Sequence, residues 1–359
     1  MRPVRHSPAT PRHPLAKICV ALCLALSISA CDQAPAPEPA KPAAPEVAPW
    51  RKFEPTLNAS LEEQSDKRLR RLTVSATGFA DAIDGLLDDT TPERLATAQQ
   101  AWSHLYLSFN ESFVMLLCRS TENPVDIARV QRADSFPILP GYIDGLSEWP
   151  ESGIVNDTAL PLTREALLEQ QDATLEGESS IGLQVIHFLL HGEPGVPRTA
   201  DALKAVTERT DDMIGEISEQ PNNRRRLYLQ LATELLVEDL TQLARDDKAP
   251  KTITRECPVG ALRETVARLL QLDGLRDHNH VGQDFIADNV RTAASTGLQN
   301  ALTPWLKKDS ALFPWLDAHE SGASANLKPA PDLNDKNRVK KLQALHAALA
   351  STQQMLKRY

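Results

Sequence analysis

The chain has 359 residues, with 39 basic and 48 acidic side chains and a net charge of −9. An acidic chain is a poor match for nucleic acid and for the surface of an anionic membrane, because both carry negative charge themselves. We therefore expect no nucleic-acid partner. The length suffices for one large folded domain or for two smaller ones.

Residues 1–30 have the pattern of an export signal. Four basic side chains and no acidic one come before a short apolar run that begins at Ile18. This run is far shorter than the roughly 20 residues that a membrane-spanning helix needs. The run leads into Ser29-Ala30-Cys31, and small residues before a cysteine resemble the lipobox of bacterial lipoproteins. We expect cleavage before Cys31 and attachment of lipid, such as palmitate, to this cysteine.

Residues 31–54 are expected to form a tether. They are rich in proline and alanine, and such a segment stays semi-extended at about 3 Å per residue, which gives a reach on the order of 60 Å. Loss of the signal removes four of the 39 basic residues and leaves 35 against 48 acidic ones, a net charge of −13. The sequence thus predicts a bacterial envelope protein that faces the periplasm and is lipid-anchored to the inner or the outer membrane.

The folded part is expected to be all-α. Apolar residues recur at helical spacing from Leu57 to Leu86 and again from Leu95 to Leu116, whereas the alternation typical of strands is scarce. A stretch over residues 120–161 is rich in proline, and loops of this length inside a compact domain tend to be functional or mobile.

Further helices are expected along the rest of the chain, near residues 163–173, 179–191, 199–219, 222–246, 258–271, 282–302 and 334–357. Prolines break the region 303–332. Helices joined in this way favour two antiparallel helical bundles of the four-helix type. The first is predicted to cover residues 55–195, including the long loop, and the second residues 196–359.

Two cysteines, Cys118 and Cys257, lie in the folded part, 139 residues apart. An exported protein meets an oxidising compartment, where such a pair forms a disulfide. The alternative is two buried free thiols.

The segment from Ser180 to Gly192 carries a single polar stripe on an otherwise apolar helix. Ser180, Gln184, His187 and His191 fall within an arc of roughly 60° when they are placed on a helix. Two interpretations stay open. The stripe is either the solvent face of the helix or a site for a divalent metal or iron, since imidazoles four residues apart reach one ion.

In the metal interpretation Gln184, His187 and His191 are ligands, and Glu111 and Glu234 are candidate further donors from other helices. A second polar group, from Asp277 to His280 with Asp284 and Asp288, is either another cation site or a solvated helix start. Three consecutive arginines, residues 224–226, are expected to form a solvated face; the alternative is a docking surface for an acidic partner.

Residues 182–192 resemble the signature helix of imelysin-like proteins, whose pattern is Gly-x-His-x-Ile-Glu-Phe-Leu-Leu-x-Gly. The matching positions are Gly182, Ile186, Phe188, Leu189, Leu190 and Gly192. Three other parts of the chain fit more loosely: Ala101-Trp102, Trp149-Pro150 and the helix from Arg225 to Leu243. The resemblance spans residues 60–357.

This resemblance implies a pair of four-helix bundles in the periplasm or on the outer membrane, and an association with iron-regulated uptake. Imelysin-like proteins were first classed as metallopeptidases because of a His-x-x-Glu motif. The chain departs from that motif, because Gln184 occupies the histidine position and His187 the glutamate position. The carboxylate that would serve as metal ligand or general base is missing, so neither the metal site nor the peptidase chemistry carries over intact.

The sequence therefore favours a lipid-anchored binding or accessory protein in iron or metal acquisition, which works beside other iron-uptake proteins of the envelope and has no reaction of its own. One alternative is a divergent metallopeptidase that uses His187 and His191. Another is a structural lipoprotein that docks an envelope partner through the loop over residues 120–161.

Overall fold

The structure is a computed structural model that describes residues 48–120, 123–136, 138–173, 177–193, 195–211, 213–245, 257–274 and 288–359. The predicted export signal, Cys31 and most of the predicted tether lie outside these residues. The polar group from Asp277 to Asp284 also lies outside them. Within the described part, residues from Ala48 to Tyr359 form one compact unit.

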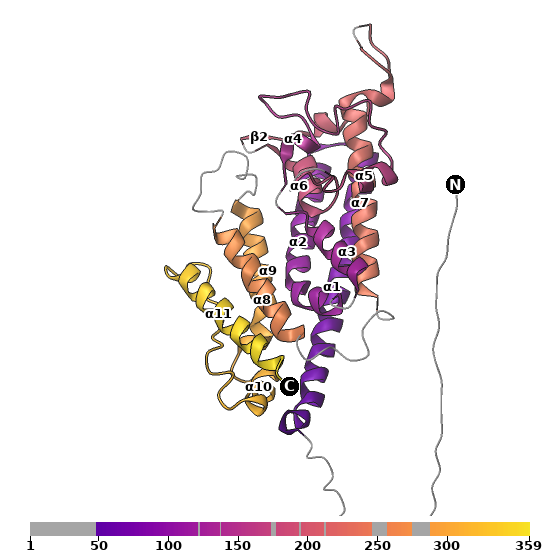
Figure 1. Ribbon diagram of the computed structural model, residues 1–359. Helices are drawn as coiled ribbons and strands as arrows, with labels where there is room; N and C mark the ends of the chain where they lie inside the picture. Colours follow the sequence, from indigo (N-terminus) through magenta and orange to yellow (C-terminus); the bar gives the residue numbers. More distant parts are fainter. Residues whose placement is uncertain are drawn as a thin grey trace, which may run out of the picture. The chain divides into compact units, whose positions relative to one another are not determined.

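The described residues are mainly helical and contain very little strand, which confirms the predicted all-α class (Figure 1). The α-helices are α1 Glu54–Asp88, α2 Pro92–Ser120, α3 Pro124–Asp134, α4 Pro140–Ile143, α5 Arg164–Gln170, α6 Leu183–His191, α7 Pro221–Ala244, α8 Cys257–Gly274, α9 Asp288–Leu306, α10 Leu312–His319 and α11 Arg338–Leu356. The short elements are the 3-10 helices η1 Pro49–Lys52, η2 Ala200–Leu203 and η3 Ile217–Glu219, and the antiparallel strands β1 Gly192–Glu193 and β2 Val196–Pro197. None of the described helices has the length and apolarity needed to cross a membrane.

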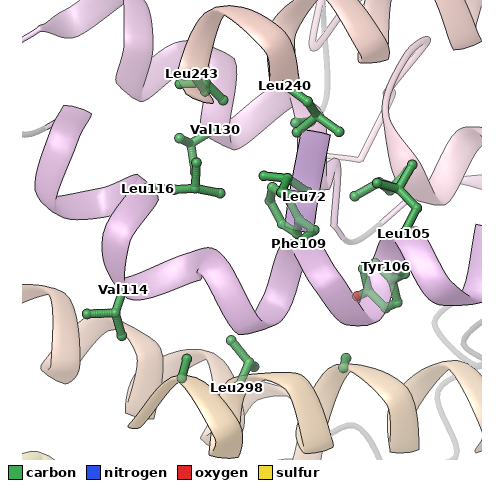
Figure 2. Packing of buried hydrophobic residues seen from close by; sticks show 14 of the residues in the cluster. Leu72, Leu105, Tyr106, Phe109, Val114, Leu116, Val130, Leu240, Leu243 and Leu298 are labelled. Atoms are coloured by element: carbon green, nitrogen blue, oxygen red, sulfur yellow. The ribbon is translucent and has the colours of Figure 1, made fainter. Parts of the chain in front are cut away.

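Helix α2 lies at the centre of the core because it is apolar on opposite sides. One side packs against α1 and α3, and the other packs against α8 and α9. Figure 2 shows this arrangement, with Leu116 directed toward Val130 of α3 and Val114 directed toward the helices on the other side. The approach of α9 is close at Gly297, where an added Cβ would lie 2.8 Å from the carbonyl oxygen of Leu107.

Helix α7 packs with the earlier helices of the chain. It packs most extensively against α1, α3 and α6, and it also contacts α2, α5, η2 and η3. The hydroxyl of Tyr228 donates a hydrogen bond to the carbonyl of Ser180 just before α6. The division predicted at residue 195 places α7 with the later helices instead. Among those later helices, α8 packs against α9 and α11.

Two segments differ from the elements predicted for them. The stretch over residues 120–161 contains α3 and α4; α3 forms because the side chain of Asn123 accepts a hydrogen bond from the N–H of Val125, and Pro124 occupies the first turn, where no N–H is needed. The helix predicted over residues 199–219 is wrong, since the described residues of this segment form no helix other than η2 and η3. That segment has no continuous apolar face, and helices of this length need one to be stable.

The three consecutive arginines of α7 are not a solvated face, so that prediction is wrong. Arg224 donates to the carbonyl oxygens of Ile154, Val155, Asp157 and Leu160. These four bonds fix the long loop to α7.

The other two arginines act in the same way. Arg225 forms a bidentate ion pair with the buried Asp144, and Arg226 donates to the carbonyls of Leu87 and Leu203. Arg224 and Arg225 are buried and Arg226 is half-buried, because every guanidinium finds carbonyl or carboxylate acceptors, which offsets the cost of removing its charge from water.

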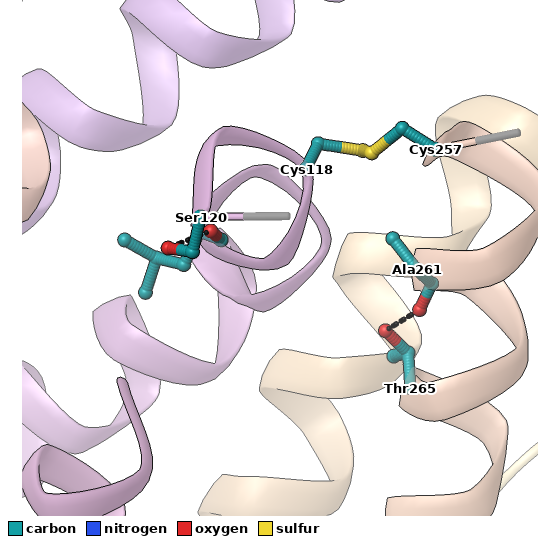
Figure 3. The surroundings of a disulfide bond; sticks show 6 residues. Cys118, Ser120, Cys257, Ala261 and Thr265 are labelled. Atoms are coloured by element: carbon teal, nitrogen blue, oxygen red, sulfur yellow. Dashed lines mark hydrogen bonds between the residues drawn. A yellow bond between two sulfur atoms is a disulfide. The ribbon is translucent and has the colours of Figure 1, made fainter. Parts of the chain in front are cut away.

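A disulfide joins Cys118, near the end of α2, to Cys257, the first residue of α8 (Figure 3). The two Cα atoms are 5.3 Å apart, and the bridge closes a sequence separation of 139 residues. This is the pairing expected from the sequence.

Candidate functional site

Helix α6 begins at a glycine that no other residue replaces easily. Gly182 has a φ of 106°, and an added Cβ would lie 2.2 Å from the carbonyl oxygen of Arg132. The hydroxyl of Ser135 donates to the carbonyl of Ile181 at the same point. The start of α6 is thus pressed against the end of α3, which explains on physical grounds why this helix opens with glycine.

The polar stripe of α6 faces protein, because every residue from Leu183 to Leu190 is buried. Gln184 is 2% exposed and His187 is 6% exposed, while His191 at the end of the helix is half-buried. The solvent-face interpretation is therefore wrong for Gln184 and His187.

The two histidines form an aromatic stack with α2. The imidazole rings of His187 and His191 have centroids 4.2 Å apart and planes inclined by 17°. The indole of Trp102 lies 4.6 Å from the ring of His187 and 4.8 Å from the ring of Tyr106, and its Nε1 donates to the carbonyl of Leu183. Trp102 thereby fixes both the position of α6 and the surroundings of the histidines.

Three nitrogens of the stripe are buried without a hydrogen-bond partner: Nε2 of Gln184, Nε2 of His187 and Nε2 of His191. Burial lowers the pKa of His187 well below its usual value, with a smaller contribution from the neighbouring His191. Burial also lowers the pKa of His191, to about 4. Both imidazoles are therefore neutral at pH 7, and a neutral imidazole can bind a metal or accept a hydrogen bond.

No carboxylate joins these histidines within the described residues, where no group of three or more His, Cys, Asp or Glu side chains could hold a metal ion. Glu111 is bound to Arg71 and Asn300, and Glu234 accepts from Gln230 and Arg164. The two glutamates considered as further donors are thus engaged elsewhere.

A metal on the stripe would need a change of ring orientation. The lone pair of an imidazole nitrogen lies in the plane of its ring, so the lone pairs of two nearly parallel rings point side by side and do not meet at one ion. Rotation of one ring about its side-chain bonds would bring both nitrogens to a shared ion. The residues thus fit a site made of nitrogen donors, and they do not fit the His-x-x-Glu site of the signature pattern.

We expect the free energy of unfolding to fall by on the order of 2 kcal/mol as the pH drops from about 6.5 to 5. In the unfolded chain the imidazoles of His187 and His191 gain protons near pH 6.5, whereas in the folded protein they do so only at lower pH. The unfolded state therefore binds more protons in this window, and stability is lost on acidification. Urea unfolding at pH 7.5 and pH 5 measures the loss, which should be smaller in the His187→Phe/His191→Phe variant. An equal loss in that variant would contradict the assignment.

Trp102 and Tyr106 belong to this site, although the polar pattern of α6 does not reveal them. The signal available in the sequence was Ala101-Trp102, which fits the imelysin pattern only loosely. Neither residue can be assigned to α6 from spacing, because both lie far from it in the sequence; Trp102, for example, is 81 positions before Leu183.

The family comparison covers most of the described fold. The model of the imelysin family, peptidase M75, matches residues 67–303, a range that contains α2, α6 and the polar stripe. A search of curated proteins found no match. Because the family model covers well over half of the chain, this protein belongs to the imelysin family.

Proposed function

We propose that this protein is a lipid-anchored accessory protein of the bacterial envelope that binds iron or another transition metal through His187 and His191 during metal acquisition. The observation that carries the proposal is the pair of neutral imidazoles whose buried Nε2 atoms have no hydrogen-bond partner. Buried polar atoms in proteins are nearly always satisfied, so such a pair is a natural place for a ligand. The export signal and the acylation at Cys31 that the sequence predicts support the proposed location.

The absence of a carboxylate from the stripe supports binding over catalysis. Hydrolysis by a metallopeptidase needs a general base beside the metal-bound water, which a glutamate usually provides. His187 occupies the position of the glutamate in the signature pattern, and its lowered pKa makes it a weak base. A bound metal would supply Lewis acidity, and in this chain its first ligands would be the two imidazoles, with Gln184 one turn away.

Two ligands from one short helix suit a site that accepts and releases an ion. Structural zinc sites use four protein ligands, and sites with fewer leave positions for water or for a ligand from another molecule. Neutral imidazole binds iron, zinc, nickel and copper alike. The site is therefore expected to be modest in affinity and broad in choice of metal.

The test is isothermal calorimetry of the purified protein with Fe²⁺, Zn²⁺ and Cu²⁺, together with haem titration followed by absorbance and a casein proteolysis assay. We expect the wild type to bind at least one of the metals and to hydrolyse no casein. His187→Phe/His191→Phe preserves the aromatic stack and should weaken binding at least tenfold. His104→Phe changes an exposed histidine of α2 and should leave binding unchanged.

Absence of metal binding in the wild type would overturn the proposal, and so would equal binding in the His187→Phe/His191→Phe variant. Proteolysis that is sensitive to a chelator and lost in this variant would replace the proposal with the metallopeptidase alternative. Haem binding without metal binding would be compatible with an accessory role in iron uptake, but it would contradict the proposed metal site.

A further inference from the structure

A cavity of about 550 Å³ opens between α2, α3 and α8, on a different part of α2 from the histidines. Its apolar wall includes Phe113, Leu117 and Val130, and Phe136 closes it beyond the end of α3. The volume lies within the range of pockets that bind small molecules. The cavity is also independent of the metal site proposed above, since it shares no lining residue with α6.

A buried ion pair lies in the wall of this cavity. Nη2 of Arg268 is 2.7 Å from Oδ2 of Asp134, and the guanidinium lies 3.9 Å from the centre of the Phe136 ring. Arg268 is only 8% exposed. The pair therefore sits in surroundings where any unsatisfied donor or acceptor is costly.

The pair leaves one donor and one acceptor unused. Nε of Arg268 and Oδ1 of Asp134 are buried and have no hydrogen-bond partner. A purely structural ion pair would be expected to use these groups internally.

The charges around the cavity favour a neutral ligand. Asp134 and Arg268 cancel each other, and the third charged group, Glu264, is held by Arg263. An anion would meet two carboxylates and a cation would meet the guanidinium. A neutral group that both accepts from Arg268 and donates to Asp134 satisfies the orphaned atoms without adding charge, and an amide has this property.

We propose that this cavity binds a small aromatic molecule with a neutral amide-type head group. The aromatic body packs against Phe113 and Phe136, since aromatic rings prefer offset or edge-to-face contact with one another. The head group accepts a hydrogen bond from Arg268 and donates one to Asp134. The site would give this protein a second ligand besides the metal.

Ligand-observed NMR with three probes of equal size tests the proposal. Benzamide is neutral and has both a donor and an acceptor, benzoate is an anion, and benzylamine is a cation. We expect the purified full chain to bind benzamide at least tenfold more tightly than either charged probe. Absence of benzamide binding, or equal binding of the three probes, would overturn the proposal.

Variants assign the binding to this cavity. Arg268→Met and Phe136→Leu should each weaken benzamide at least tenfold, whereas Arg70→Met, which removes an exposed arginine of α1, should not. Arg268→Met leaves Asp134 without its partner, so this variant should gain affinity for benzylamine, which loss of folding would not produce. If Arg268→Met does not fold, Phe136→Leu decides: benzamide binding equal to that of the wild type in this variant would overturn the proposal.

Discussion

Replacement of Asp144 by alanine is expected to lower the free energy of unfolding by about 3–5 kcal/mol. The side chain of Asp144 is 1% exposed, and it pairs with Arg225 at 2.6 Å and with Arg198 at 2.7 Å. Both guanidiniums are largely buried, with side-chain exposures of 9% and 13%. The alanine variant would leave two buried cations without a counter-charge, and this is far more costly than the loss of an exposed ion pair.

The same change should also disturb α6. Arg198 donates from its backbone N–H to the carbonyl of His191 and from its side chain to the carbonyl of Leu189. Asp144 thus connects α7, through Arg225, to the last turn of the helix that carries the histidines. We expect metal binding by the Asp144→Ala variant to be weaker even under conditions where the variant is still folded.

Urea unfolding followed by circular dichroism at 222 nm measures the effect on stability. The control is Asp201→Ala, which removes an exposed pair with Lys204 and should cost less than about 1 kcal/mol. A loss below about 1 kcal/mol for Asp144→Ala, similar to that of the control, would show that the pairs do not hold the loop to α7.

Loss of the disulfide is the second large effect. Reduction, or the Cys118→Ser/Cys257→Ser variant, is expected to lower the free energy of unfolding by about 2–5 kcal/mol, because a bridge across 139 residues restricts the unfolded chain over a long loop. The bridge also joins α2 to α8 directly, so its loss should loosen the contact between these helices first (Figure 3).

Guanidinium unfolding with and without a thiol reductant tests this prediction. The reductant should destabilise the wild type and leave the double serine variant unchanged, which also controls for the other cysteines of the chain. If the wild type were equally stable in both conditions, the bridge would contribute nothing to the stability of the fold.

The long helices could be predicted because the spacing of apolar residues that indicates them is a local feature of the sequence. Residues from Leu57 to Leu86 repeat at helical spacing, and α1 covers them all. The segment over residues 199–219 failed for the opposite reason: its composition permits a helix, but it has no continuous apolar face that packing could stabilise. Arg224 was misread because its acceptors are carbonyls of a loop more than 60 residues earlier, which local sequence cannot reveal.

In the candidate site, too, the local features could be predicted from the sequence, whereas the features that depend on distant residues could not. The stripe of Gln184, His187 and His191 follows from helical geometry alone. Its burial does not, because burial depends on Trp102 and on the packing of α2 against α6. The pair of Asp134 and Arg268 was also out of reach, since these two residues are distant in sequence and each looks like an ordinary surface charge. The sequence pattern thus identified α6 as the helix that carries the candidate ligands. The burial of these side chains depends on tertiary packing, which the pattern does not contain.

The central claim is that His187 and His191 bind a metal together. The most direct measurement is ¹⁵N NMR of protein labelled at histidine, with zinc titrated into the sample. The account predicts that the Nε2 resonances of His187 and His191 shift together and saturate at one equivalent of metal, while the resonances of exposed His104 stay in place. Unchanged Nε2 resonances for the two α6 histidines in the presence of excess zinc would contradict it.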